Sequence, residues 1–337
     1  MSLFASRLDP VEWHPEDPPA MTGALAQDRA LADCDRVATV DGPEDVAFDD
    51  EGRLYTGAED GGVYRTVEPV DAGTTDAEVE VFARVDGRPL AVEFDGDDLL
   101  VAAIDAGLLS VAPDGTVTEL VTRAGGQDVG FADDVHVADD GTVYFTDATV
   151  HDVYQDELFE LRDTGRLLAY HPDGGETTVE LEGLGFANGL VPGPDGDSLL
   201  INETSRYRIT RYWLDGERAG ERELFAENLL GYPDNIDEGR DGTYWVAVPA
   251  VRTALLDRIH HHPWLIRQVG RLPQWVLASV SPDRYGLVLQ VDEEGEVVDS
   301  LHDPSGAVHY VTSATPHDGA LYLGTLVGDA VRRYPLA

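Results

Sequence analysis

The stretch Phe131-Ala-Asp-Asp-Val-His-Val-Ala-Asp-Asp-Gly-Thr-Val-Tyr-Phe-Thr-Asp147 reads as two β-strands around a tight turn. Apolar and polar residues alternate up to Val137, Asp140-Gly141 supplies turn residues, and β-rich sequence resumes at Val143. Two adjacent carboxylates, Asp133 and Asp134, stand where the first strand begins. A hairpin does not need like charges there, because they repel each other. These two residues are therefore candidates for a role of their own.

The same strand–turn–strand frame recurs along the chain. Four copies place an oxygen-bearing residue seven positions before an acidic residue and a glycine, and these residues are Glu44, Asp133, Asn188 and Asp234. Two weaker copies contain Leu90 and Val311 at this point of the frame. All-β repeats of about 40–50 residues are typical of propellers. The sequence therefore predicts an all-β fold, a six-bladed β-propeller.

Equivalent positions in successive blades converge on the axis of a propeller, so the four oxygen-bearing residues are expected to meet. Carboxylates and amides gathered at one point need a counter-charge, because unpaired buried charge is costly. Oxygen donors of this kind favour Ca²⁺, with Mg²⁺, Mn²⁺ and Zn²⁺ left open. The sequence thus predicts one divalent cation on the axis. The alternative is that these residues only cap turns at strand starts.

The charge balance restricts the partners and the surroundings of the protein. The 337 residues include 65 acidic and 23 basic side chains, a formal net charge of −42, and all of the latter are arginine. Such a field argues against nucleic acid and anionic membranes as partners and favours a halophilic, archaeal source. The single cysteine, Cys34, excludes an intrachain disulfide. With neither a signal peptide nor an apolar run of membrane length, we expect a cytoplasmic protein without a membrane span.

The expected domain organisation is an N-terminal arm (1–40) that packs on a propeller (41–337). Residues 36–40 are expected to add an outer strand to the last blade. Blade 1 is expected over about 42–67, and an acidic spacer (68–78) then leads to blade 2, which begins at Val79.

A segment of about 250–282 interrupts blade 5 with a pattern of two short helices separated by Pro263. This segment is basic although the chain as a whole is acidic. Its one acidic residue is Asp257, and its four arginines are Arg252, Arg258, Arg267 and Arg271. Three interpretations remain open. The insertion forms a lid over the channel mouth, or it contacts a partner subunit or membrane surface, or it packs as a plain excursion.

Several runs match a known family in order. They are Gly42-Pro-Glu-Asp-Val-Ala-Phe-Asp49, Gly87-Arg-Pro-Leu90, Phe131-Ala-Asp-Asp-Val-His-Val137, Phe186-Ala-Asn-Gly-Leu190 and Gly231-Tyr-Pro-Asp-Asn-Ile236. Over about 40–337 the chain resembles the strictosidine-synthase-like, or adipocyte plasma-membrane-associated, proteins, relatives of the gluconolactonases and paraoxonases. The resemblance implies a six-bladed propeller with one axial divalent metal. The ligands that it implies are Glu44, Asp133, Asn188, Asp234 and Asn235.

The chain departs from its relatives at three positions. Asp133 stands where these relatives usually have asparagine, which adds a negative charge. Leu90 stands where paraoxonases have a catalytic histidine. Thr312 stands where plant synthases have a glutamate that drives condensation, which argues against an alkaloid-forming reaction.

The resulting functional hypothesis is a metal-dependent hydrolase that acts on a small-molecule lactone or aryl ester. The metal would polarise the carbonyl group, and Asp234 would act as a base or as a nucleophile. Asp234 and Glu44 are the candidate catalytic residues. Two alternatives remain: a non-catalytic, metal-stabilised propeller that serves as a binding scaffold, and a phosphotriesterase-type hydrolase.

Overall fold

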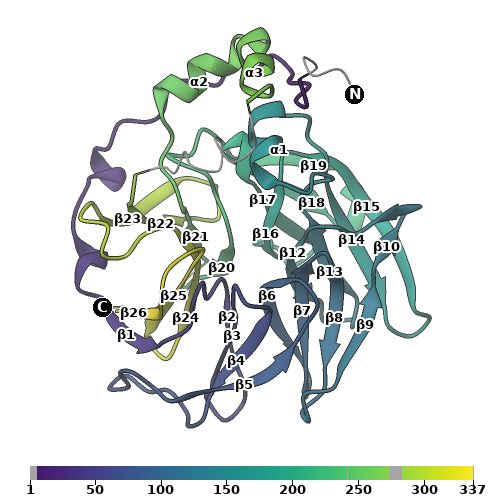
Figure 1. The fold of residues 1–337 in the computed structure, drawn as a ribbon, viewed down its shortest axis with the longest axis vertical. Helices are drawn as coiled ribbons and strands as arrows, with labels where there is room; N and C mark the ends of the chain where they lie inside the picture. Colours follow the sequence, from purple (N-terminus) through teal and green to yellow (C-terminus); the bar gives the residue numbers. More distant parts are fainter. Residues whose placement is uncertain (1–5, 241, 273–282, 337) are drawn as a thin grey trace.

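The computed structural model describes residues 6–240, 242–272 and 283–336. In these ranges the long strands form six four-stranded antiparallel sheets around one axis, as Figure 1 shows. The prediction of a six-bladed β-propeller with a short helical insertion is therefore confirmed.

The strands of each blade follow one another from the axis outward, with one exception in blade 6. Blade 1 consists of β2 (Val46–Phe48), β3 (Leu54–Gly57), β4 (Gly62–Thr66) and β5 (Val79–Arg84). Blade 2 consists of β6 (Arg88–Asp95), β7 (Asp98–Ile104), β8 (Gly107–Val111) and β9 (Val117–Val121). Blade 3 consists of β12 (Ala132–Val137), β13 (Val143–Asp147), β14 (Gly165–His171) and β15 (Glu176–Leu184).

Blade 4 consists of β16 (Ala187–Pro192), β17 (Ser198–Glu203), β18 (Arg208–Trp213) and β19 (Arg222–Ala226). Blade 5 consists of β20 (Ile236–Glu238), β21 (Tyr244–Ala247), β22 (Gly286–Val291) and β23 (Val297–Asp303). Blade 6 consists of β24 (Val311–His317), β25 (Ala320–Thr325), β26 (Val331–Pro335) and β1 (Asp35–Ala38). A two-stranded hairpin, β10 (Arg123–Ala124) with β11 (Gln127–Asp128), follows blade 2.

The ring closes through the N-terminal part of the chain. Strand β1 pairs antiparallel with β26, with Asp35 opposite Arg333, and so becomes the outer strand of blade 6. The sequence predicted this strand at 36–40, close to its position in the structure. This pairing gives the last blade its fourth strand and joins the N-terminal part of the chain to the C-terminal part.

One predicted blade boundary is wrong. Val79 was predicted to begin blade 2. It is instead the first residue of β5, which pairs with β4 and completes blade 1. The acidic segment 68–78 is a loop within blade 1 and not a spacer between blades. The alternating apolar residues of β5 pair as well with β4 as they would with a strand of the next blade, so periodicity alone cannot assign them.

The hydrophobic core lies between blades. The buried residues form a separate cluster at each of the six contacts between neighbouring blades, and a seventh cluster lies at the channel mouth. Between blades 2 and 3, for example, Leu100 and Leu108 pack against Val143 and Phe145. Each blade is thus stabilised mainly by its two neighbours.

Polar contacts also link each neighbouring pair of blades close to the axis. These hydrogen bonds are between 2.5 and 3.2 Å long, and the pairs are Asp45–Val92, Glu93–Val137, Asp134–Leu190, Asn202–Asp234, Asn235–Thr312 and Thr312–Glu44. Three of the bonds end on the backbone of a residue that the sequence predicts as a metal ligand. The ring closure therefore fixes the main chain around the axis.

Among the described residues, three α-helices lie at one end of the ring, at the top of Figure 1. Helix α1 (Tyr154–Glu160) interrupts blade 3, whereas α2 (Ala254–His260) and α3 (Pro263–Val269) interrupt blade 5. The hydroxyl of Thr253 accepts a hydrogen bond from the backbone of Leu256 and caps α2. Pro263 is the first residue of α3, where proline is favoured. The remainder of the predicted insertion, 273–282, lies outside the described residues.

Short 3₁₀ helices occur at Gly23–Leu25, Ala30–Asp33, Thr204–Arg206 and Gly216–Arg218. Within the described parts of the chain, no helix is both long and apolar enough to cross a bilayer.

Replacing Gly324 by Ala is expected to destabilise the protein by about 1–3 kcal/mol, the range for overpacking in a filled site. A Cβ atom at this position would overlap the backbone oxygen of Glu44 across the contact between blades 6 and 1. Gly130→Ala is the matched control, since its Cβ would meet no atom within 4 Å. Chemical unfolding at constant high salt measures both variants, and equal stabilities would contradict the expected clash.

Candidate metal centre

The inner strands of blades 3 and 4 carry β-bulges where the repeated frame has its oxygen-bearing residue. The pairing of β12 with β13 shifts between Ala132 and Val135, and that of β16 with β17 shifts between Ala187 and Leu190. A bulge leaves residues out of the ladder and redirects their side chains. Asp133 and Asn188 lie in these two bulges. Glu44 and Asp234 lie just before β2 and β20, at the same end of the channel.

Three of the predicted ligands meet on the axis. Glu44, Asp133 and Asp234 each offer one carboxylate oxygen, and these three oxygens all lie within 4.8 Å of one another. The residues are only 2%, 2% and 8% exposed, respectively. No second group of three or more His, Cys, Asp or Glu side chains with this spacing exists in the described part of the chain.

The two predicted amide ligands adjoin these carboxylates. The side chain of Asn188 forms a hydrogen bond with Asp234, and the Nδ2 atom of Asn235 lies 3.4 Å from Oε2 of Glu44. The Oδ1 atoms of both asparagines are buried and accept no hydrogen bond from the protein. Buried polar atoms usually have partners. Two orphaned amide oxygens beside three carboxylates therefore fit a hard divalent cation, which prefers oxygen ligands.

The electrostatics of the cluster show why a cation suits it. Burial, reinforced by the charges of Asp234 and Asp133, raises the pKa of Glu44 well above its ordinary value. Burial also raises the pKa of Asp133, and the charge of Asp234 adds to that effect. For Asp234, burial raises the pKa to about 7, while the hydrogen bond with Asn188 and the charge of Arg88 oppose the rise. Three carboxylates in one buried site cannot all ionise without a positive partner.

Arg88 is a functional candidate that the sequence analysis did not single out. Its positive charge lowers the pKa of Glu44, Asp133 and Asp234 alike. The Nη2 atom donates a 2.6 Å hydrogen bond to the backbone oxygen of Leu326, whereas Nε is buried and has no partner. The motif Gly87-Arg-Pro-Leu90 contained this residue, but nothing in the sequence placed its side chain beside carboxylates from three other blades.

Three further carboxylates, only one of which the sequence indicated, also have raised pKa values. Burial raises the pKa of Asp45 and of Asp134, and it raises the pKa of Asp237 to about 8. Asp45 and Asp134 each follow a predicted ligand by one residue, and this adjacency was the available signal. Both accept hydrogen bonds from the backbone of the next blade, from Val92 and Leu190 respectively, so they hold blades together.

Apolar and aromatic side chains border the cluster. Leu90, Phe131 and Phe186 pack together in one buried group at the start of the inner strands of blades 2, 3 and 4. Tyr154, at the start of α1, is 37% exposed, and partial burial together with the charge of Asp234 raises the pKa of its hydroxyl. Leu90 thus contributes to an apolar wall. A buried carboxylate group of this kind can hold a cation.

Comparison with known proteins relates the chain to one family. The family model described as strictosidine synthase matches residues 133–217, and the model described as strictosidine synthase-like, N-terminal, matches 23–66. Adipocyte plasma membrane-associated protein from Salmo salar is 36% identical over 346 residues, with 93% of this chain and 81% of that protein covered. Strictosidine synthase-like 7 from Arabidopsis thaliana is 36% identical over 301 residues, with 87% and 79% covered.

Solved structures show the same fold at low identity. A gluconolactonase from Xanthomonas campestris has a TM-score of 0.63 at 18% identity, with 99% of this chain and 98% of that chain covered. A calcium-binding protein, regucalcin, from Agrobacterium tumefaciens has a TM-score of 0.61 at 14% identity, with 90% and 93% covered. At these identities the likeness concerns the propeller architecture.

Proposed function

Because the chain belongs to the strictosidine synthase-like family, together with the adipocyte plasma membrane-associated proteins, we propose that it is a divalent-metal-dependent hydrolase of lactones or aryl esters. The observation that carries this proposal is the buried group of Glu44, Asp133 and Asp234, next to two amide oxygens without a partner. The apolar group of Leu90, Phe131 and Phe186 favours a hydrolase over a metal-stabilised scaffold, which needs only the metal ligands.

The ligand roles follow from the donor set. Glu44, Asp133, Asp234 and the amide oxygens of Asn188 and Asn235 would hold the cation. Bound there, a divalent cation would polarise a carbonyl group and stabilise the negative charge that develops on its oxygen. Five protein oxygens are fewer than the six to eight that Ca²⁺ takes, which leaves positions for water or substrate. A calcium-binding propeller among the structural neighbours supports Ca²⁺ as the first metal to test.

The protein side chains supply the remaining functions. Asp234 would accept a proton from the attacking water or would itself attack the carbonyl, and the hydrogen bond with Asn188 orients its carboxylate. With a cation bound, Glu44 would be ionised, and the positive charges of the cation and Arg88 would balance the three carboxylates. The apolar group of Leu90, Phe131 and Phe186 contacts the organic part of the substrate and excludes water.

Elemental analysis of the purified protein in high salt tests the proposal, followed by removal of the metal and reloading with Ca²⁺, Mg²⁺, Mn²⁺ or Zn²⁺. The expected result is one divalent ion per chain. Hydrolysis of a lactone or aryl ester should disappear with the ion and return with it. Asp237→Asn is the matched control, because it alters a buried acid of blade 5 outside the three-carboxylate group.

The substrate panel also distinguishes the alternatives. Faster turnover of phosphotriesters than of any lactone would indicate a phosphotriesterase. Loss of stability on metal removal, with no turnover of any substrate, would contradict the hydrolase and indicate a metal-stabilised scaffold.

A further inference from the structure

Residues 6–17, here called the strap, run between the two helical insertions. Figure 1 shows this N-terminal segment beside α3 and above α1. Its backbone donates hydrogen bonds to both insertions, from Arg7 to Gly270 at 3.2 Å and from Val11 to Glu160 at 2.9 Å. The strap therefore contacts blade 3 and blade 5 insertions that are about a hundred residues apart in sequence.

Two strap residues bridge α1 and α3 directly. The guanidinium of Arg7 binds the carboxylate of Asp156 on α1 at 2.9 Å, and it donates to the backbone oxygen of Leu272, beyond α3, at 3.2 Å. The neighbouring contacts come from Asp9. Its backbone donates to the buried carboxylate of Glu160 at 2.7 Å.

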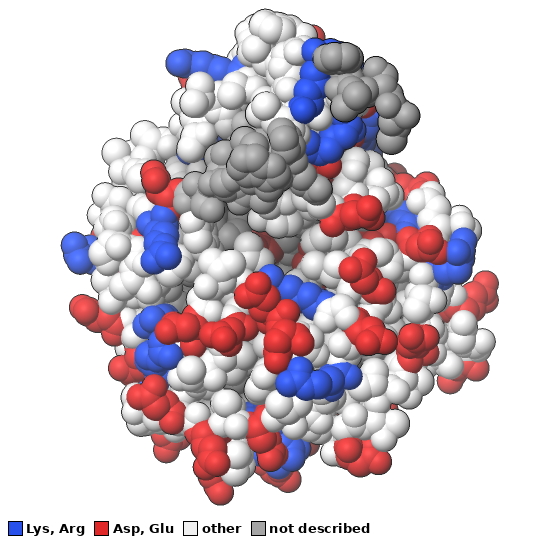
Figure 2. All heavy atoms as spheres, in the orientation of Figure 1, with Lys and Arg blue, Asp and Glu red and all other residues white. Residues whose placement is uncertain are grey.

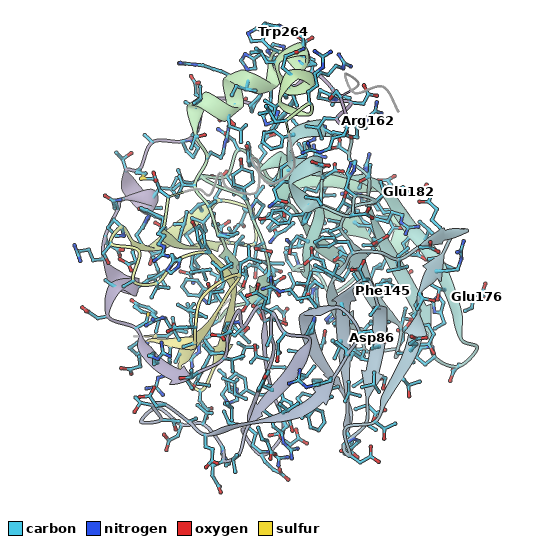
Figure 3. The ribbon with its side chains drawn as sticks, viewed as in Figure 1. Asp86, Phe145, Arg162, Glu176, Glu182 and Trp264 are labelled. Carbon is cyan, nitrogen blue, oxygen red and sulfur yellow. The ribbon has the colours of Figure 1, made fainter. Side chains whose placement is uncertain are left out.

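The side chain of Asp9 completes this bridge. Its carboxylate lies 3.0 Å from Arg267 of α3 and also pairs with Arg162, which follows α1. Figure 3 shows Arg162 below the helical tip that carries Trp264. Figure 2 shows basic side chains gathered at this end, whereas acidic side chains spread over the blades below. One short segment thus neutralises part of the basic insertion and joins it to α1.

A close packing contact fixes the strap between these ion pairs. Leu8 is only 2% exposed, and its Cβ atom would lie 2.9 Å from a Cβ built on Gly270. Gly270 has a φ of −63°, an ordinary helical value. Glycine at this position is thus needed for the close approach of the strap and not for its own backbone conformation.

The far end of the strap is anchored beside α2. The indole of Trp13 packs on Tyr207 at 5.3 Å and on His260 of α2 at 6.0 Å between ring centroids. Arg252, which is 6% exposed, donates to the backbone oxygen of Glu16 at 2.6 Å and pairs with Asp257 of α2 at 3.1 Å. The strap therefore contacts α1, α2 and α3.

Both insertions are linked to residues near the three-carboxylate group. Tyr154, the first residue of α1, lies near enough to Asp234 for the carboxylate charge to act on its hydroxyl. On the other side, Asp257 of α2 accepts a 3.3 Å hydrogen bond from Tyr207, whose hydroxyl lies 3.3 Å from that of Tyr232. Tyr232 precedes Asp234 by two residues. A shift of α1 would therefore change the surroundings of Asp234, and a shift of α2 would act on them through Tyr207 and Tyr232.

We propose that the strap holds α1 and the α2–α3 pair in one fixed arrangement and that this arrangement determines which substrates reach the axial site. The second half of this statement rests on the proposed hydrolase function; the first half does not. A positioning element of this kind changes selectivity without taking part in the chemistry.

Hydrogen exchange of the full-length Gly270→Ala variant tests the coupling of the helices. The new methyl group should displace the strap, and exchange in Tyr154–Glu160 and in Ala254–Val269 should rise together by about tenfold, the effect of losing one or two hydrogen bonds. Gly130→Ala is the control and should leave both segments unchanged. Faster exchange in only one of the two segments would overturn the coupling.

A second variant, Arg7→Ala, keeps the packing of the strap and removes one of its two bridges, while that of Asp9 remains. Arg84→Ala, which removes an exposed Arg–Asp pair on blade 1, is its control. We expect Arg7→Ala to raise kcat/KM for a bulky aryl ester relative to a small lactone by about fivefold, mainly through KM, with metal content unchanged. An unchanged ratio, despite faster exchange, would overturn the role in selectivity. If no variant and no parental protein hydrolyses any substrate, the proposed function is contradicted. The exchange result alone then tests whether the strap couples the helices.

Discussion

Replacing Asp234 by Asn is expected to lower kcat/KM for the best lactone or ester substrate by about 10³-fold, within the range for loss of a general base. Asparagine keeps an oxygen that can contact a cation, but it cannot accept the proton of the attacking water. Most of the metal should therefore remain bound. Steady-state kinetics and elemental analysis of the same preparation measure the two quantities.

Asp133→Asn provides the matched comparison, because it removes the same charge from the same group of three carboxylates. If Asp133 only holds the cation, its activity should fall by about tenfold, the lower range for loss of a supporting metal contact. Equal losses in the two variants would mean that the negative charge matters and that Asp234 is not the base. Near-parental turnover of Asp234→Asn would remove this residue from the chemistry.

The metal-free protein is expected to lose stability as the pH rises from about 4 to about 7. Burial raises the pKa of Asp234 from 3.8 to about 7 in the folded chain. A raised carboxyl pKa means that the folded state binds the proton more tightly than the unfolded state does. The stabilisation is therefore complete below pH 4 and is lost as the pH passes through the folded value. For this one group the loss amounts to about 4 kcal/mol.

A bound cation should remove this pH dependence, because it compensates the ionised carboxylates. Thermal unfolding of metal-free and metal-loaded protein at fixed salt and several pH values measures the difference. The gap in Tm should widen from pH 5 to pH 8. General repulsion in this acidic protein affects both forms alike, so a gap that stays constant with pH would contradict the account.

Much of the fold could be predicted from the repeated frame. The turn pair after Val137 and the residues around it specify a hairpin locally, and six copies of this hairpin define the propeller. The fourth strand of blade 1 was misassigned because β5 follows a long acidic loop and its alternation does not identify a partner. Helix α1 was not predicted either, since seven residues give too short a periodic pattern.

The meeting of three carboxylates could also be predicted, because each of them belongs to the frame of its own blade. Glu44, Asp133 and Asp234 meet in the structure as the sequence predicts. Arg88 and Tyr154 could not be found in this way. Arg88 lies two residues before the frame position of blade 2, and Tyr154 belongs to an insertion. Their proximity to Asp234 depends on ring closure and on the placement of a helix, which no local pattern encodes.

The insertion in blade 5 shows a further limit of sequence analysis. Its basic composition suggested a lid, a partner contact or a packed excursion. In the described residues, Arg252 and Arg267 are both engaged by the N-terminal strap. Part of the basic charge thus has an intramolecular partner far away in sequence, which composition alone cannot reveal.

Anomalous diffraction from crystals grown at high salt with Mn²⁺ in place of the natural cation tests the central claim most directly. The account predicts a single strong peak on the axis, within bonding distance of oxygens from Glu44, Asp133 and Asp234 and of the Oδ1 atoms of Asn188 and Asn235. The absence of an anomalous peak between these five side chains would contradict the predicted metal site, whether Mn²⁺ binds elsewhere in the crystal or not at all.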